Sequence, residues 1–222
     1  MTSRDLRIAL ALALLAAMFR LPRLHAPAEE YFDEVYHAVS ARQYLAGEGP
    51  IEWVHPPMAK LLIAGGLWAL GYAPPAGARI VAGDQFVPAW AWRLMPALFG
   101  VALAPLFYLF ARRVLATERA ALLAAVLLLA DGVYLVQSRI AMTNIFAVVF
   151  QVGAASLLLR AALEETLPVG GMLGVGLALG LALATRWTSL FAMAFMGLVF
   201  LTLRRLRLLR SEERRVGKEC RL

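Results

Sequence analysis

Two adjacent carboxylates, Asp33 and Glu34, lie near the start of the one long polar stretch of this sequence, residues 31–60. A carboxylate can act as a general base and take the proton of an attacking hydroxyl group. Repulsion between neighbouring acids can also raise one of their pKa values toward a useful range. Adjacent acids are common in surface loops, however, and Asp33 is also a plausible helix N-cap, so both interpretations stay open.

Basic residues accompany this acidic pair at the end of the polar stretch and at the ends of later apolar segments. The candidates are His55, Lys60, Arg93, Arg139 and Arg186. Guanidinium groups bind phosphate in a fork geometry and remain charged when partly desolvated. A single arginine at a membrane boundary can instead extend to lipid headgroups. Three arginines on the same side as the carboxylates favour a site that holds both a phosphate and an acid–base group.

Such a site suits transfer of a sugar from a lipid-linked phosphate. The phosphate is already a good leaving group, and cations that stabilise its departure can replace a general acid. One carboxylate then suffices to deprotonate the attacking hydroxyl.

The composition indicates a polytopic, all-α membrane protein. Of the 222 residues, 61% are hydrophobic, compared with about 45–50% in soluble domains. The formal net charge of +7 does not point to nucleic acid, because basic residues in cytoplasmic loops orient membrane proteins. The chain has one cysteine, Cys220, so no disulfide can form within it.

The apolar runs predict a transmembrane module over residues 1–209. Its spans are expected at 6–24, 91–111, 119–137, 140–160, 168–185 and 188–203. The first run also fits a signal-peptide core, but we expect an uncleaved span. Within the outer loop, 25–90, a helix over 34–46 ending at Gly47 and a second helix after the two prolines at 56–57 should lie in the interface.

The last residues, 210–222, resemble the translation of a sequencing-adapter oligonucleotide in their RSEERRVGKEC run. We therefore expect this tail to be non-native and exclude it from fold reasoning. Sequencing the uncut gene tests this directly, because an in-frame RSEERRVGKEC in that gene would contradict it.

Five motifs in order resemble those of bacterial-type protein O-mannosyltransferases, which are membrane glycosyltransferases of the GT-C fold. They are FDEV at 32–35, HPPMAK at 55–60, AWRLMPALFG at 91–100, DGVYLVQSRIAMTN at 131–144 and ATRWTSLF at 184–191. Each motif alone is weak, but their order and spacing match the N-terminal part of the family over about residues 8–205.

The resemblance implies an enzyme of the plasma membrane that transfers mannose from a polyprenyl-phosphate donor to Ser or Thr of exported proteins. It implies an inverting reaction that needs no metal or other cofactor. Asp33 is the expected base, and Glu34 is expected to support it or to contact the acceptor. The resemblance assigns the five basic residues above to the donor phosphate or substrate. Complete members have many more spans, so we expect this chain to be inactive alone.

Two alternatives remain at this point. A related GT-C transferase that modifies lipid A or a cell-wall glycan would also use an outer acidic residue and a polyprenyl donor, although the FDEV and HPPMAK motifs favour the protein-modifying branch. A transporter or scaffold subunit is the non-enzyme alternative. Transporters tend to place ionisable groups in the middle of broken spans, whereas here these groups gather at one face.

The placement of arginines predicts a cytoplasmic N-terminus and an extracytoplasmic loop at 25–90. Arg112, Arg113 and Arg119 then fall in one inner loop. A reporter fused after Gly49 should therefore read as extracytoplasmic and one fused after Thr117 as cytoplasmic. If both reporters gave the same location, the six-span arrangement would be wrong.

Overall fold

The computed structural model describes residues 2–83, 86–163 and 169–219, and its regular structure is helical throughout. The helices are α1 (Ser3–Arg20), α2 (Glu34–Ala46), α3 (Met58–Ala69), α4 (Ala89–Val114), α5 (Glu118–Ala130), α6 (Gly132–Gln137), α7 (Asn144–Leu163), α8 (Val169–Thr185) and α9 (Ser189–Glu219). The predicted all-α class is confirmed.

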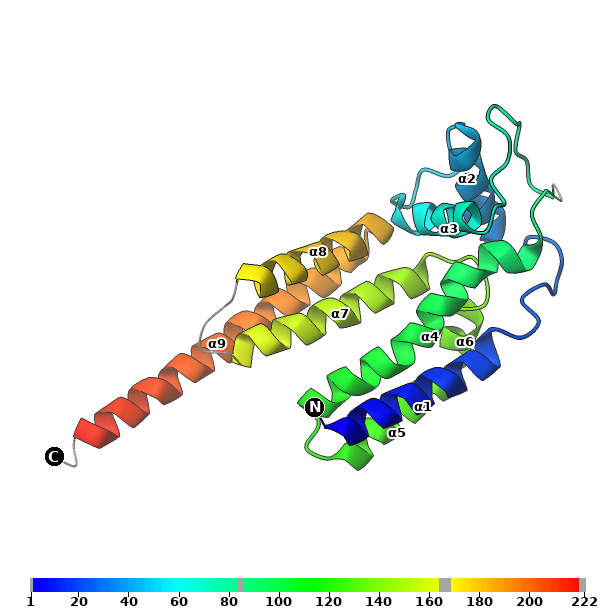
Figure 1. Cartoon of the computed structure of the whole chain (residues 1–222). Helices are drawn as coiled ribbons and strands as arrows, with labels where there is room; N and C mark the ends of the chain where they lie inside the picture. Colours follow the sequence, from blue (N-terminus) through cyan, green and yellow to red (C-terminus); the bar gives the residue numbers. More distant parts are fainter. Residues whose placement is uncertain (1, 84–85, 164–168, 220–222) are drawn as a thin grey trace.

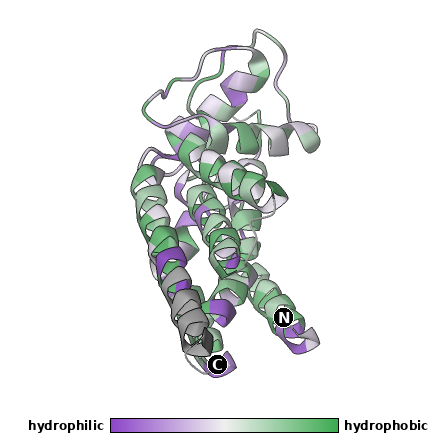
Figure 2. Ribbon diagram, turned by 90° about the vertical axis from the view of Figure 1, so that its left-hand side faces the viewer, coloured by the Kyte–Doolittle hydropathy of each residue, from purple (hydrophilic) through white to green (hydrophobic). Residues whose placement is uncertain are grey.

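The long helices run side by side, and α2 and α3 gather at one end of this bundle (Figure 1). Helix α4 is central, because it packs against α1, α5 and α7, and α7 in turn packs against α8 and α9. Three of the described helices are long and apolar enough to cross a membrane, namely α4, α7 and the Ser189–Arg207 part of α9. Apolar residues dominate the middle of the bundle (Figure 2).

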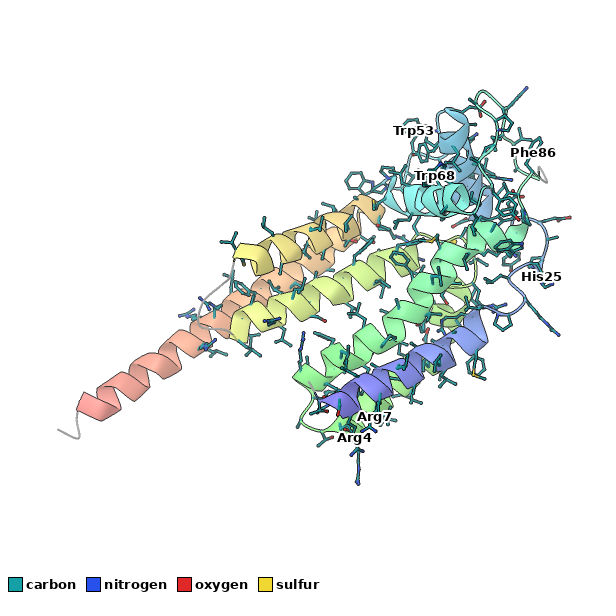
Figure 3. The ribbon with its side chains drawn as sticks, viewed as in Figure 1. Arg4, Arg7, His25, Trp53, Trp68 and Phe86 are labelled. Atoms are coloured by element: carbon teal, nitrogen blue, oxygen red, sulfur yellow. The ribbon has the colours of Figure 1, made fainter. Side chains whose placement is uncertain are left out.

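The two ends of the bundle differ in character. Trp53 and Trp68 lie at the end that carries α2 and α3, whereas Arg4 and Arg7 lie at the opposite end (Figure 3). Aromatic residues are typical of membrane interfaces, and basic residues are typical of the cytoplasmic side.

Small side chains allow the helices around α4 to approach closely. The core between α1, α4 and α5 is built largely from alanines, as in other closely packed membrane helices. At Gly100 in α4 the approach is so close that no side chain fits, because a Cβ there would lie 2.4 Å from the Cβ of Ser138. The segment after α6 can therefore pack directly against the backbone of α4.

The predicted span at 119–137 is two helices rather than one. Asp131 ends α5, and its carboxylate accepts a hydrogen bond from the backbone N–H of Tyr134 at 2.6 Å, which caps α6. Aspartate favours this capping position over a helix interior. The next helix, predicted from residue 140, begins only at Asn144. The intervening turn, 138–143, is thereby free to face the outer loop.

The two helices of the outer loop lie where the sequence placed them. Helix α2 starts after Asp33 and ends at Gly47, whose φ of +80° is the left-handed conformation that glycine tolerates best. Helix α3 follows the two prolines and has 12 residues. At 1.5 Å per residue it is about 18 Å long, too short to cross a bilayer.

Helix α9 continues to Glu219 and projects beyond α7 and α8 (Figure 1). It therefore runs past the predicted end of the last span, residue 203, and into the segment 210–222. Residues 220–222 of that segment, including Cys220, lie outside the described residues.

Candidate active site

The acidic pair meets the first arginine in a buried ion pair. The Glu34 side chain is fully buried, and the Arg93 side chain is 1% exposed. Two parallel contacts join them, because Nε of Arg93 donates to Oε1 of Glu34 at 2.8 Å and Nη2 donates to Oε2 at 2.6 Å. This is the bidentate geometry that makes arginine–carboxylate pairs strong and directional.

The remaining polar atoms of this pair are also satisfied. The Glu34 carboxylate accepts from the backbone N–H groups of Ala141 and Tyr31, each at 2.9 Å. Arg93 donates to the carbonyls of three residues in the segment after α1. They are Leu24 at 3.0 Å, Pro27 at 2.6 Å and Glu29 at 2.9 Å. Every N–H of the guanidinium therefore has a protein acceptor.

Glu34 was expected to support Asp33 or to contact the acceptor, and Arg93 was expected to bind the donor phosphate or substrate. In the structure both side chains are engaged by protein groups. Their bonds join the segment 24–29, helix α2, helix α4 and the turn at Ala141. Neither residue lines the pocket that contains Asp33. Their geometry fits a role in holding these four segments together.

Asp33, in contrast, lines a pocket of about 360 Å³. The residues that line it are Asp33, Tyr36, His37, Ile51, Glu52, Trp53, Val54 and His55. Asp33 is half-buried and occupies the N-cap position of α2, but its side chain makes no capping hydrogen bond. Among the described residues, nothing donates a hydrogen bond to its carboxylate. A simple capping role for this side chain is therefore not what the structure shows.

Phe32 turns the chain sharply just before the two acids. Its φ is +57°, in the left-handed region that non-glycine residues rarely adopt. This sharp turn comes directly before Asp33, the N-cap residue of α2. Backbone strain of this kind often accompanies functional sites.

Glu52 is a member of this pocket that the sequence analysis missed. Its Oε2 accepts a hydrogen bond from Nζ of Lys60 at 2.8 Å, and its Oε1 accepts from the backbone N–H of His55 at 2.7 Å. Burial raises the pKa of Glu52, but the hydrogen bonds from Lys60 and His55 outweigh it and bring the pKa to about 2. Glu52 is therefore ionised at neutral pH.

Lys60 is also enclosed rather than open to substrate. Its side chain is 1% exposed. Besides the Glu52 carboxylate, its ammonium group donates to the carbonyls of Glu52 at 2.8 Å and His55 at 3.1 Å. An ammonium group has three N–H donors, so all of them have partners. Lys60 thus fixes the loop 52–55 against α3.

Two histidines meet in the same pocket. The rings of His37 and His55 pack edge to face with centroids 5.3 Å apart. Burial lowers the pKa of His37 to about 4, and the nearby His55, Lys60 and Arg186 act in the same direction, against Glu52. His37 is therefore neutral at pH 7. His37 forms part of the pocket wall.

The other two arginines differ in how fully they are engaged. Arg139 donates to the carbonyls of Phe19 at 2.7 Å, Arg20 at 3.0 Å and Pro22 at 2.8 Å, and so caps the end of α1. The guanidinium of Arg186 has no hydrogen-bond partner among the described residues. It lies close enough to His37 to affect that pKa.

The α8–α9 corner that carries Arg186 is tied to the outer loop. Nε1 of the adjacent Trp187 donates to the carbonyl of Val54 at 3.0 Å, and Val54 lines the Asp33 pocket. The structure thus brings the last predicted motif beside the first two. Of the three predicted arginines, Arg186 is the one whose guanidinium has no hydrogen-bond partner in the described part of the chain, and its neighbour Trp187 contacts this pocket's loop.

A second pocket, of about 420 Å³, is lined in part by Glu29, whose carbonyl accepts a hydrogen bond from Arg93. His25, Glu29, Glu30 and Trp92 are among the residues that line it. Glu30 is paired with Arg42 there. The described residues hold no group of three or more His, Cys, Asp or Glu side chains that could bind a metal.

Comparison with known proteins identifies the family of this chain. Residues 10–215 match the family described as dolichyl-phosphate-mannose-protein mannosyltransferase. The chain belongs to this protein mannosyltransferase family.

Named relatives in this family include actinobacterial enzymes. The polyprenol-phosphate-mannose–protein mannosyltransferase of Corynebacterium glutamicum is 35% identical over 173 residues, which cover 68% of this chain and 30% of that protein. The protein of the same name from Mycolicibacterium smegmatis strain ATCC 700084 is 32% identical over 217 residues, covering 84% of this chain and 39% of that protein. The chain thus spans about a third of the length of these relatives.

Solved structures show the same fold. The Saccharomyces cerevisiae protein O-mannosyltransferase Pmt1–Pmt2 complex bound to the sugar donor matches with a TM-score of 0.79 and 26% identity, over 92% of this chain and 29% of that one. ArnT from Cupriavidus metallidurans, bound to undecaprenyl phosphate, matches with a TM-score of 0.54 and 16% identity, over 91% of this chain and 41% of that one. The predicted GT-C transmembrane architecture of this multi-pass membrane protein is confirmed.

The buried ion pair yields a stability prediction. Glu34→Gln leaves the Arg93 charge buried without its counter-charge, and breaking a buried pair in this way costs about 3–5 kcal/mol. We expect the melting temperature of the detergent-solubilised protein to fall clearly. Asp33→Asn is the matched control, because the neighbouring carboxylate has no hydrogen-bond donor to lose. Equal melting temperatures for the two variants would contradict this role of Glu34.

Proposed function

We propose that the complete protein transfers mannose from a polyprenyl-phosphate donor to Ser or Thr hydroxyls of exported proteins, and that the Asp33 pocket is where transfer occurs. Family membership supports the reaction class. The observation that carries the assignment of the pocket is the contrast between the two acids: Glu34 is saturated by protein donors, whereas the Asp33 carboxylate opens on a pocket.

Asp33 acts as the general base in this proposal. An ionised carboxylate can accept the proton of the attacking hydroxyl as the bond to the sugar forms. Attack on the face opposite the phosphate inverts the anomeric carbon. The proton then resides on Asp33, and the phosphate departs with the electron pair of the broken bond.

Arg186 stabilises the departing phosphate. Its guanidinium is the one among the three predicted arginines that combines proximity to the pocket with unused donors in the described part of the chain. A cation placed where negative charge develops lowers the barrier without acting as an acid. Arg93, Arg139 and Lys60 then serve the site indirectly, by fixing the segments that form it.

The pocket is proposed to open on the extracytoplasmic side of the plasma membrane, with the N-terminus in the cytoplasm. The positions of Trp53 and Trp68 at one end and Arg4 and Arg7 at the other support this orientation. The lipid bilayer would deliver the donor along the apolar faces of the helices. Because this chain spans about a third of its relatives, we propose that it is inactive without the remaining spans.

Asp33→Asn in the complete protein tests the assignment. The amide cannot accept the hydroxyl proton, so turnover should fall on the order of 10²–10⁴-fold, while donor binding and melting temperature stay near those of the wild type. The measurements are transfer of labelled mannose from a polyprenyl-phosphate donor to a Ser/Thr peptide, and donor binding in parallel.

Glu29→Gln is the matched control, since it makes the same acid-to-amide change in the second pocket rather than in the Asp33 pocket. It should leave turnover nearly unchanged. Near-normal turnover of Asp33→Asn, combined with a large loss for Glu29→Gln, would move the reaction to the second pocket and overturn the proposal.

A further inference from the structure

His55 and Glu52 form a hydrogen-bonded pair in the wall of the Asp33 pocket. Nδ1 of His55 lies 3.2 Å from Oε1 of Glu52, and the backbone N–H of His55 donates to the same oxygen. The Glu52 side chain is 9% exposed, whereas the His55 side chain is 28% exposed and lines the Asp33 pocket. The buried carboxylate therefore contacts the inner edge of a ring that is partly open to the pocket.

The contact selects one tautomer of the imidazole. An ionised carboxylate can only accept hydrogen bonds, so the proton between the two groups must belong to Nδ1 of His55. In the neutral ring, Nε2 is then an acceptor without a proton. A carboxylate that orients a histidine through its other nitrogen is a recurrent arrangement in functional sites.

We propose that Glu52 is a positioning residue that holds His55 in the Nδ1–H tautomer, so that Nε2 accepts a hydrogen bond from an N–H or O–H group of the incoming Ser/Thr acceptor segment. This inference rests on the proposed function, because it places the acceptor in the Asp33 pocket. It assigns separate roles to two acceptors in one pocket: Asp33 receives the reacting proton, and His55 holds the segment that carries it.

The surroundings of the pair favour a fixed ring. Glu52 cannot turn away from His55, because its other oxygen accepts from Lys60 and lies 3.7 Å from Nδ1 of His37. The charged or titratable groups that face this pair also include Asp33, Tyr44 and Arg186. The carbonyl of His55 binds Lys60, and the carbonyl of Val54 binds Trp187, so the backbone is held on both sides of the pair.

His55→Asn distinguishes the role of Nε2 from that of Nδ1, because it removes only the former. The asparagine amide reaches the position of Nδ1 and can still donate to Glu52, but it has no atom at the position of Nε2. We expect the KM for the acceptor peptide to rise about 3- to 10-fold, as for loss of one hydrogen bond of about 1 kcal/mol. The affinity for the polyprenyl-phosphate donor should not change.

Glu52→Gln should give the same rise in the acceptor KM, because one amide oxygen cannot serve both Lys60 and His55. If Glu52 acts through His55, the variant that carries both changes should be no worse than the more impaired single variant. Glu48→Gln is the matched control, since Glu48 is an acid of the same loop that does not line the pocket. Should Glu52→Gln fail to fold, adding Lys60→Met removes both buried charges and allows the same comparison.

The tautomer can be read without an activity assay. In ¹⁵N-histidine-labelled complete protein, the His55 signals are those that His55→Asn lacks. Their shifts should indicate a protonated Nδ1 and an unprotonated Nε2, and Glu52→Gln should shift them toward a mixture. An Nε2–H tautomer in the wild type, or the same tautomer in Glu52→Gln, would overturn the proposal.

The experiments distinguish failure of the role proposed for His55 from failure of the proposed function. Additive effects of Glu52→Gln and His55→Asn on the acceptor KM, or an unchanged KM in His55→Asn, would refute the role of His55 even if mannose is transferred. No mannose transfer by the wild-type protein would refute the proposed function, and the role at the acceptor with it, while the ¹⁵N shifts would still decide whether Glu52 sets the tautomer.

Discussion

The ion pair between Glu34 and Arg93 is the interaction on which the rest of the end of the bundle that carries α2 and α3 depends. Charges taken out of water are tolerated only when every donor and acceptor has a partner. Here the Arg93 guanidinium binds the segment after α1 as well as Glu34, and Glu34 also binds Ala141. One buried cation thus connects segments far apart in the sequence, and the pocket walls are attached to those segments.

This arrangement gives two neighbouring acids different properties. Glu34 is surrounded by donors and buried, so it has no free lone pair for chemistry. Asp33 is one residue away, at the N-cap of α2, and its side chain lines the pocket. Helix α2 therefore starts with one residue fixed in the core and one available to a substrate. The strain at Phe32 is tolerable because the adjacent ion pair holds the chain in place.

Local features of the sequence predicted the helices well, and the partners of the charged residues poorly. Gly47 and the two prolines mark the ends of α2 and α3 through backbone preferences that need no tertiary contact. The aspartate–glycine step at 131–132 carried a capping signal, but the long apolar run around it concealed the break. That carboxylate and carbonyl oxygens saturate Arg93 and Lys60 depends on residues up to 69 positions away in the chain. Glu52 had only its spacing of three residues from His55 as a signal.

The central claim is that the Asp33 pocket, rather than the second pocket beside Glu29, receives the sugar. A structure of the complete protein with a non-hydrolysable polyprenyl-phosphate-mannose analogue tests it most directly. The phosphate should lie within hydrogen-bond distance of the Arg186 guanidinium and the anomeric carbon should face Asp33, with the Glu34–Arg93 pair intact. A phosphate bound to Arg93 in place of Glu34, or a sugar seated beside Glu29, would contradict it.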